Sequence, residues 1–117
     1  MTADIVTVYH NPRCGKSRAA LALLAERGIE PRVVEYLKEP LSRDELKALL
    51  AELKMPARDL VRRGEPVCKE LYAGGDLDDD AWLDAMVDHP ILMERPIVVR
   101  GARAVVARPT EKLLDLF

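Results

Sequence analysis

Hydrophobic and polar residues at the start of the chain follow a strand pattern, then a helix pattern, then a strand pattern again. The β-branched run 5–9 precedes a helical periodicity over residues 17–28, and a second β-branched run occupies residues 32–36. Ser17 is expected to cap this helix and Gly28 to end it. A strand, a helix and a strand within so short a stretch predict two parallel strands joined by a right-handed crossover.

The middle of the chain has helical patterning that turn residues interrupt. Residues 42–45 (Ser-Arg-Asp-Glu) form a capping box sequence, which predicts the start of a helix. The inward face of that helix carries Leu46, Leu49, Leu50 and Leu53. Residues 55–89 are expected to form short helical pieces separated by proline and glycine, including Gly74-Gly75. The last piece is predicted to begin at the acidic residues 78–80 and to end at His89-Pro90. Its inward face carries Trp82, Leu83, Met86 and Val87.

The last part of the chain returns to strand patterning. Residues 97–99 and 104–106 are apolar runs joined by a tight turn, and residues 109–117 have a helical pattern that is expected to pack back. The predicted order is therefore β-α-β, a helical block, and β-β-α. This is the order of a thioredoxin-like α/β fold with a helical insertion between its halves, and we expect residues 1–117 to form a single domain of this type.

The composition is that of a globular protein with a modest core: of 117 residues, 49% are hydrophobic and 32% are charged. The formal net charge of −2 argues against nucleic acid binding, which favours a surplus of Lys and Arg. No apolar run is long enough to span a membrane, and none precedes the first strand as a secretory signal would. We therefore expect a protein of the reducing cytoplasm, without nucleic acid or membrane partners.

The candidate chemistry lies in the polar loop over residues 10–18, between the first strand and the first helix. Cys14 lies in this loop, where unpaired N–H groups at a helix start favour a thiolate and lower the pKa of a cysteine. The same N–H groups can bind a tetrahedral oxyanion. We therefore expect Cys14 to be a nucleophile, with the loop positions Asn11, Gly15 and Ser17 lining an anion site beside it.

The loop has no second cysteine at the spacing of a C-x-x-C pair, because Asn11 and Ser17 stand three residues away from Cys14 on either side. Ser17 could instead donate a hydrogen bond to the sulfur, cap the helix, or do both. Cys68 lies in the helical block without a basic cluster. It could resolve a modified Cys14, but we interpret it as a packing residue or an idle thiol. The two histidines and two cysteines lack the spacing of metal ligands, so no metal site is expected.

One histidine and several arginines are placed to assist Cys14. His10 would support the thiolate as a cation or orient the loop as a neutral ring, and the residues leave both roles open. Arg95 precedes Pro96 at the start of a strand, where thioredoxin-like folds usually have a cis proline, and it would then point toward the sulfur. Arg108 precedes Pro109 in a comparable place, and either Arg62 or Arg63 could reach inward. Arginine suits this task because its guanidinium binds two oxygens of an anion at once.

These motifs together resemble the glutaredoxin-coupled arsenate reductases. The resemblance rests on His10-x-x-x-Cys14-x-x-x-Arg18, on residues 89–99 (HPILMERPIVV) and on residues 108–111 (RPTE), and it extends over essentially the whole chain. It implies a thioredoxin-like fold with a helical insertion and Cys14 as the nucleophile. It further implies that His10 helps to keep Cys14 ionised and that Arg62, Arg95 and Arg108 hold the anion.

The resemblance also implies a reaction. Cys14 would attack the arsenic of arsenate, glutathione would attack the adduct as co-substrate, and glutaredoxin would complete electron delivery, with no bound cofactor. Two other functions stay open from the residues. One is a glutathione-linked thiol–disulfide oxidoreductase, whose substrate would not need three arginines. The other is a non-enzymatic redox regulator of the same fold, which often carries a C-x-x-C pair.

Overall fold

The computed structural model of the chain describes residues 5–72 and 77–117. Two compact units divide the chain. The sheet unit comprises Met1–Glu39 and Arg95–Phe117, and the helical unit comprises Pro40–Glu94. The helical unit is therefore an insertion between the two halves of the sheet unit, as the order of predicted elements indicates. The Gly74-Gly75 turn lies outside the described residues.

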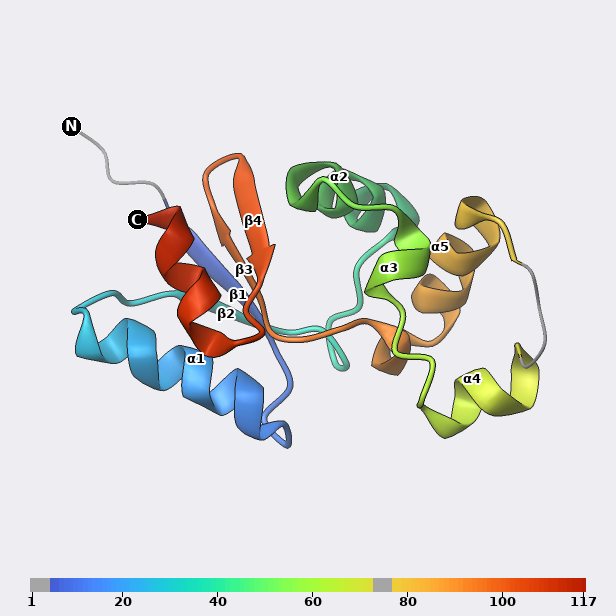
Figure 1. Cartoon of the computed structure of the whole chain (residues 1–117), viewed down its shortest axis with the longest axis horizontal. Helices are drawn as coiled ribbons and strands as arrows, with labels where there is room; N and C mark the ends of the chain where they lie inside the picture. Colours follow the sequence, from blue (N-terminus) through green and yellow to red (C-terminus); the bar gives the residue numbers. More distant parts are fainter. Residues whose placement is uncertain (1–4, 73–76) are drawn as a thin grey trace. The chain divides into compact units, whose positions relative to one another are not determined.

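The sheet unit is built on four strands in the order β2-β1-β3-β4 (Figure 1). The strands are β1 (Val6–His10), β2 (Arg32–Glu35), β3 (Ile97–Arg100) and β4 (Arg103–Val106). The predicted parallel pairing of β1 with β2 is confirmed, while β1 with β3 and β3 with β4 are antiparallel. Gly101, at a φ of 60°, forms the predicted tight turn between β3 and β4, a backbone conformation that favours glycine.

One face of the sheet is covered by α1 (Gly15–Glu26) and by the C-terminal segment η2 (Thr110–Leu116), which is a 3-10 helix. The alternation of side chains along β1 turns Val6 and Val8 to this face, and the helical spacing of Ala20 and Leu24 meets them. The hydrophobic core of the sheet unit contains Val6, Val8, Ala20, Leu24, Val98, Ala107, Leu113 and Leu116. This layer of helix on sheet is what anchors the start of α1, and with it the loop that carries Cys14.

The start of α1 differs from the prediction. The helix begins at Gly15 with Cys14 at its N-cap position, and no side chain caps it. The prediction that Ser17 caps the helix is therefore wrong: Ser17 lies inside the first turn and is fully buried, and its hydroxyl accepts a hydrogen bond from the backbone N–H of Asn11 at 3.3 Å. The other end agrees with the prediction, since the helix stops at Glu26 and Gly28 adopts a φ of 72°.

The helical unit contains α2 (Arg43–Leu53), α3 (Ala57–Leu60), α4 (Pro66–Leu71), α5 (Asp79–Asp88) and the 3-10 turn η1 (Pro90–Leu92). Helix α5 packs against α2, α3 and η1, and it buries Trp82, Leu83, Ala85 and Met86. The capping box is confirmed: the hydroxyl of Ser42 accepts from the N–H of Glu45 at 3.1 Å, and the Glu45 carboxylate accepts from the N–H of Ser42 at 2.9 Å. Asp78 caps α5 through the N–H of Ala81 at 2.8 Å.

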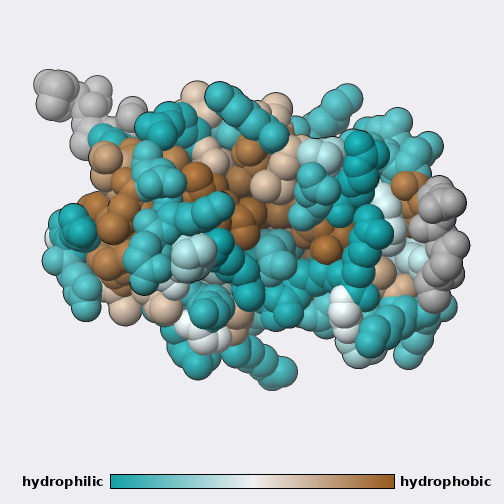
Figure 2. Space-filling model, viewed as in Figure 1, coloured by the Kyte–Doolittle hydropathy of each residue, from teal (hydrophilic) through white to brown (hydrophobic). Residues whose placement is uncertain are grey.

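Hydrophilic side chains cover much of the face drawn in Figure 2, with hydrophobic atoms in patches between them. Among the residues that the structure describes, the large exposed hydrophobic side chains are Ile5, Val33, Leu37, Leu71 and Phe117. Within residues 5–72 and 77–117, none of the helices has the length and apolar character that a membrane crossing requires.

Candidate functional site

The loop between β1 and α1 is held in one shape by Asn11. The side-chain oxygen of Asn11 accepts a hydrogen bond from the N–H of Arg13 at 3.0 Å, and its backbone oxygen accepts from the N–H of Cys14 at 2.9 Å. Its own N–H is bound by the buried hydroxyl of Ser17. Because Asn11 is itself buried, these three hydrogen bonds close a tight turn that presents Cys14 at the first turn of α1.

Cys14 is a free cysteine whose side chain is partly exposed. Burial alone would raise the pKa of its thiol. Hydrogen bonds to the sulfur from the N–H of Ser17, the guanidinium of Arg95 and the N–H of Lys16, together with the positive charge of Arg95, outweigh that effect and lower the pKa from 9.0 to about 7. About half of the sulfur is therefore a thiolate at neutral pH. The hydrogen bond from Ser17 comes from its backbone and not from its hydroxyl.

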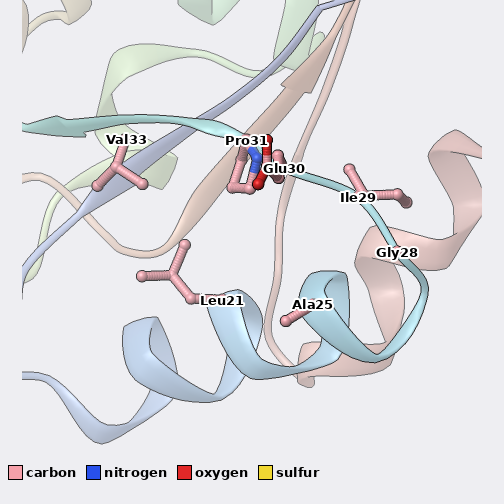
Figure 3. A pocket seen from close by; sticks show the side chains of 7 residues that line it. All are labelled: Leu21, Ala25, Gly28, Ile29, Glu30, Pro31 and Val33. Atoms are coloured by element: carbon pink, nitrogen blue, oxygen red, sulfur yellow. The ribbon is translucent and has the colours of Figure 1, made fainter.

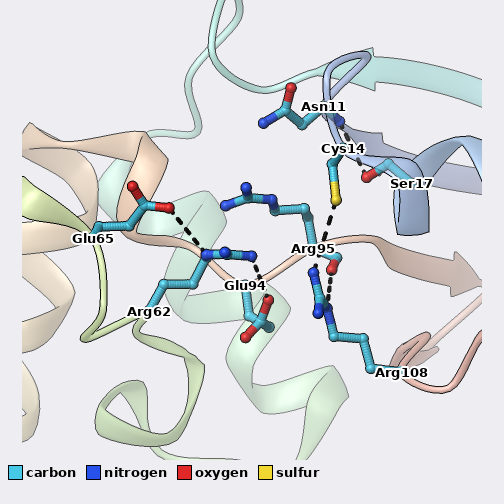
Figure 4. Close-up of polar contacts among 8 residues, drawn as sticks. All are labelled: Asn11, Cys14, Ser17, Arg62, Glu65, Glu94, Arg95 and Arg108. Atoms are coloured by element: carbon cyan, nitrogen blue, oxygen red, sulfur yellow. Dashed lines mark hydrogen bonds and ion pairs between the residues drawn. The ribbon is translucent and has the colours of Figure 1, made fainter.

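The hairpin of β3 and β4 brings Arg95 and Arg108 together. Ile97 pairs with Val106, so the residues that precede β3 and follow β4 lie side by side, and both Arg95-Pro96 and Arg108-Pro109 are cis peptide bonds. The Nε of Arg108 donates to the backbone oxygen of Arg95 at 2.7 Å, and its Nη2 lies 3.8 Å from the sulfur of Cys14 (Figure 4). Two guanidinium groups thus contact the sulfur of Cys14 from the open end of the β3–β4 hairpin.

Two contacts at this site have no signal in the sequence pattern. One is the hydrogen bond from Arg108 to the Arg95 backbone, which links residues 13 positions apart. The other is the hydrogen bond from Nη1 of Arg18 to the backbone oxygen of Pro12 at 2.9 Å, which braces the loop from the exposed side of α1. Gly15 is exposed, and a Cβ placed on it would lie at an ordinary 3.7 Å from Nη2 of Arg18. Space around Gly15 therefore does not require glycine.

His10 ends β1 on the same face as Val6 and Val8 and is buried. Burial lowers the pKa of its imidazole below 6.5; the Glu35 carboxylate acts in the opposite direction, and the charge of Arg18 lowers it further. Of the two roles that the residues leave open, the neutral ring is therefore the one present at neutral pH. A neutral imidazole contributes no positive charge to the thiolate, and the buried Nδ1 of His10 has no hydrogen-bond partner within the described residues.

Arg62 and Arg63 belong to the helical unit and have different surroundings. The guanidinium of Arg62 is paired with two carboxylates, those of Glu65 and Glu94. The guanidinium of Arg63 stacks over the ring of Trp82 at 4.9 Å from its centre. A polar, multiply donating guanidinium suits anion binding better than one that lies on an indole, so Arg62 is the better candidate of the pair.

Cys68 is buried in α4, as a packing residue should be. No group of His, Cys, Asp and Glu within the described residues has the arrangement of a metal site.

A pocket of about 800 Å³ opens between α1 and β2 (Figure 3), and it is lined by Leu21, Ala25, Gly28, Ile29, Glu30, Pro31 and Val33. None of these seven residues belongs to the loop over residues 10–18, so the pocket is separate from Cys14.

The arrangement around Cys14 combines a nucleophile with an anion-binding surface. The thiolate is available at neutral pH, and two guanidinium groups and two backbone N–H groups surround it. An anion is repelled by a bare thiolate, and fixed positive groups offset that repulsion as the two approach. Attack of a sulfur on a tetrahedral oxyanion is therefore the chemistry that these residues can perform.

Comparison with known proteins is consistent with this chemistry. The family model described as "ArsC family" matches residues 9–116. The chain is 50% identical over 113 residues to the uncharacterized protein YfgD of Escherichia coli strain K12, with 95% of each chain covered. It is 46% identical over 112 residues to the arsenate reductase of Rhizobium meliloti strain 1021, covering 95% of this chain and 80% of the relative. The solved structure of the arsenate reductase from Vibrio cholerae superimposes with a TM-score of 0.93 at 45% identity, covering 99% of this chain and 100% of the other.

Proposed function

The chain belongs to the ArsC family, and from this premise we propose that it is an arsenate reductase that converts arsenate to arsenite. The observation that carries the proposal is the sulfur of Cys14, with its pKa near 7 and two arginines directed at it. Relatives from Rhizobium meliloti and Vibrio cholerae that bear the name arsenate reductase are 46% and 45% identical to this chain.

The first step is attack of the Cys14 thiolate on arsenic. A sulfur–arsenic bond forms while one arsenate oxygen takes up protons and leaves as water. Arg95, Arg108 and the N–H groups of Lys16 and Ser17 hold the remaining oxygens, whose negative charge would otherwise repel the sulfur. Phosphate has the same shape and charge and would occupy the same place, but it is not reduced by thiols.

The second step needs a thiol from outside this loop, since Asn11 and Ser17 occupy the positions where a C-x-x-C partner would stand. A glutathione thiolate attacks the Cys14 sulfur and forms a mixed disulfide. The electron pair of the broken sulfur–arsenic bond stays on arsenic, which leaves as arsenite. Glutaredoxin with further glutathione then reduces the mixed disulfide and restores the Cys14 thiol. No bound cofactor enters this cycle, and we place it in the cytoplasm, where glutathione is abundant and reduced.

Arg62 is proposed as a third anion-binding arginine. The resemblance to glutaredoxin-coupled arsenate reductases matches Arg62 with one of the family's arginines, and its guanidinium is already held among polar partners. His10 is proposed to orient the loop as a neutral ring. Asn11 is proposed to shape the anion site through its hydrogen bonds to Arg13 and Cys14, and the backbone of Gly15 is proposed to line that site.

The test is arsenate-dependent NADPH oxidation in the presence of glutathione, glutaredoxin and glutathione reductase, with Cys14→Ser as the control. Turnover that requires arsenate and disappears in Cys14→Ser would support both the reaction and the nucleophile. An absence of turnover, with rapid alkylation of Cys14 at neutral pH, would refute the proposed substrate and favour a thiol–disulfide oxidoreductase. A Cys14 that reacts no faster than an ordinary thiol would refute the site itself.

A further inference from the structure

The guanidinium of Arg62 is held by two carboxylates from different parts of the helical unit. Its Nη1 donates a hydrogen bond to Oε1 of Glu94 at 3.1 Å, and its Nε lies 3.2 Å from Oε1 of Glu65 (Figure 4). The three side chains are only partly exposed, by 26% for Arg62, 19% for Glu65 and 29% for Glu94. The hydrogen bond between Arg62 and Glu94 is therefore partly buried.

The backbone fixes the three residues with respect to one another. Val61 and Met93 form an antiparallel bridge, the N–H of Arg62 donates to the oxygen of Leu92 at 2.7 Å, and the N–H of Glu94 donates to the oxygen of Leu60 at 2.9 Å. The N–H of Glu65 in turn donates to the oxygen of Arg62 at 3.2 Å. The two carboxylates therefore start from fixed positions, and the long Arg62 side chain is the part that they restrain.

We propose that Glu65 and Glu94 are positioning residues that orient Arg62 for oxyanion binding. The inference rests on the proposed function, in which Arg62 holds the anion. Free arginine side chains populate many rotamers, and ordering one on binding reduces affinity. Glu94 accepts a hydrogen bond from Nη1, Glu65 forms an ion pair with Nε without accepting a hydrogen bond from it, and neither of these contacts involves Nη2. Glu65 and Glu94, which we call the clamp, thus restrict the direction of Nη2 before the anion binds.

The carboxylates also oppose the positive charge of Arg62, and this effect has the opposite sign. Two negative groups beside one guanidinium weaken its long-range attraction for an anion. At side chains that are a fifth to a third exposed, solvent screens that charge effect more than it weakens the directional hydrogen bond. Orientation is therefore expected to dominate, and Gln in place of Glu94 separates the two effects because it keeps the acceptor oxygen and removes the charge.

The experiment compares Glu94→Ala and Glu94→Gln with wild type, using Glu70→Ala as the matched control. Glu70 is an exposed residue of α4 whose loss changes the net charge equally without touching Arg62. We expect Glu94→Ala to raise the KM for arsenate and the Kd for phosphate about fivefold, with kcat changed less than about twofold, since one hydrogen bond to a charged group is lost. Glu94→Gln and Glu70→Ala should stay within about twofold of wild type.

Phosphate binding by calorimetry makes the test independent of turnover, because phosphate is bound without being reduced. If wild type lacks arsenate turnover, the proposed function fails, and the phosphate Kd still tests the clamp. If Arg62→Ala weakens phosphate binding but Glu94→Ala does not, the inference is overturned while the proposed function stands. Glu94→Gln as impaired as Glu94→Ala would also overturn it, because charge and not orientation would then be responsible. Unchanged thermal unfolding temperatures establish that the variants are folded.

Discussion

Replacing Arg95 by alanine should make Cys14 a weaker acid. At a pKa of about 7, half of the thiol is ionised at neutral pH, whereas at 9.0 only about one part in a hundred would be. The substitution removes the hydrogen bond and the charge that the guanidinium contributes. It leaves the N–H groups of Lys16 and Ser17 in place, and it keeps the backbone oxygen on which Arg108 is anchored. We therefore expect a partial loss, with the pKa of Cys14 raised by roughly one unit.

The assay is the rate of alkylation of Cys14 by iodoacetamide as a function of pH, from about pH 5 to about pH 10. A rise of roughly one unit takes the thiolate fraction at pH 7 from about half to about a tenth, so the alkylation rate at that pH should fall about fivefold. The plateau at high pH corrects for any change in intrinsic reactivity. Cys68 is buried and should react slowly, and Cys14→Ser measures its share.

Arg103→Ala is the matched control for this experiment. Arg103 belongs to the same hairpin, and its guanidinium donates to the backbone oxygen of Asp115 at 2.8 Å. Its loss changes the net charge by the same amount as the loss of Arg95. Because Arg103 is not among the groups that shift the pKa of Cys14, that pKa should not move. An unchanged midpoint in Arg95→Ala would refute the assignment of the low pKa to Arg95. An equal shift in Arg103→Ala would show that the effect is one of overall charge.

The other predictions concern the helical unit, the loop and the core. Arg62→Ala should raise the KM for arsenate about tenfold, because it removes a charged hydrogen-bond donor, whereas Arg63→Ala should leave the KM unchanged because its guanidinium lies on Trp82. Steady-state kinetics measures both values, and an equal rise in KM for the two variants would contradict the choice of Arg62 over Arg63. The folded protein lowers the pKa of His10, so the unfolded state binds more protons below about pH 6.5 and acidification through that range destabilises the fold. His10→Gln should therefore lose less stability than wild type between pH 7 and pH 5 in urea titrations, and parallel losses would exclude His10 as a source. Leu24→Ala should lower the free energy of unfolding by about 3 kcal/mol in the same titrations, because Leu24 is fully buried in the sheet unit's core. A decrease below about 1 kcal/mol would mean that neighbouring side chains fill the cavity.

The order of elements was predictable because it depends on local patterns. β-branched runs, a capping box at Ser42 and a glycine after the first helix are signals carried by neighbouring residues, and the structure has the corresponding elements. The position of Cys14 between a strand and a helix is of the same kind. Its low pKa follows partly from that position, since two backbone N–H groups at the helix start bind the sulfur.

The first turn of α1 shows where local patterns are insufficient. Ser17 has the residue type of a cap, but its hydroxyl is buried and serves Asn11, so the helix starts earlier than its composition suggests. A serine can satisfy either role, and the choice depends on which N–H lies nearby once the loop has closed. The charge state of His10 is decided in a similar way by how deeply β1 buries it.

The amino-acid sequence by itself determined the order of elements, the parallel β1 and β2 pair, and the place of Cys14 at a helix start. Only the tertiary structure decided which groups surround each arginine. Arg95 and Arg108 meet because the register of β3 and β4 places them side by side, and Arg62 differs from Arg63 because one meets two carboxylates and the other an indole. Periodicity reports which side of an element a residue occupies. The direction and partners of a long charged side chain depend on residues far away along the chain, which come together only on folding.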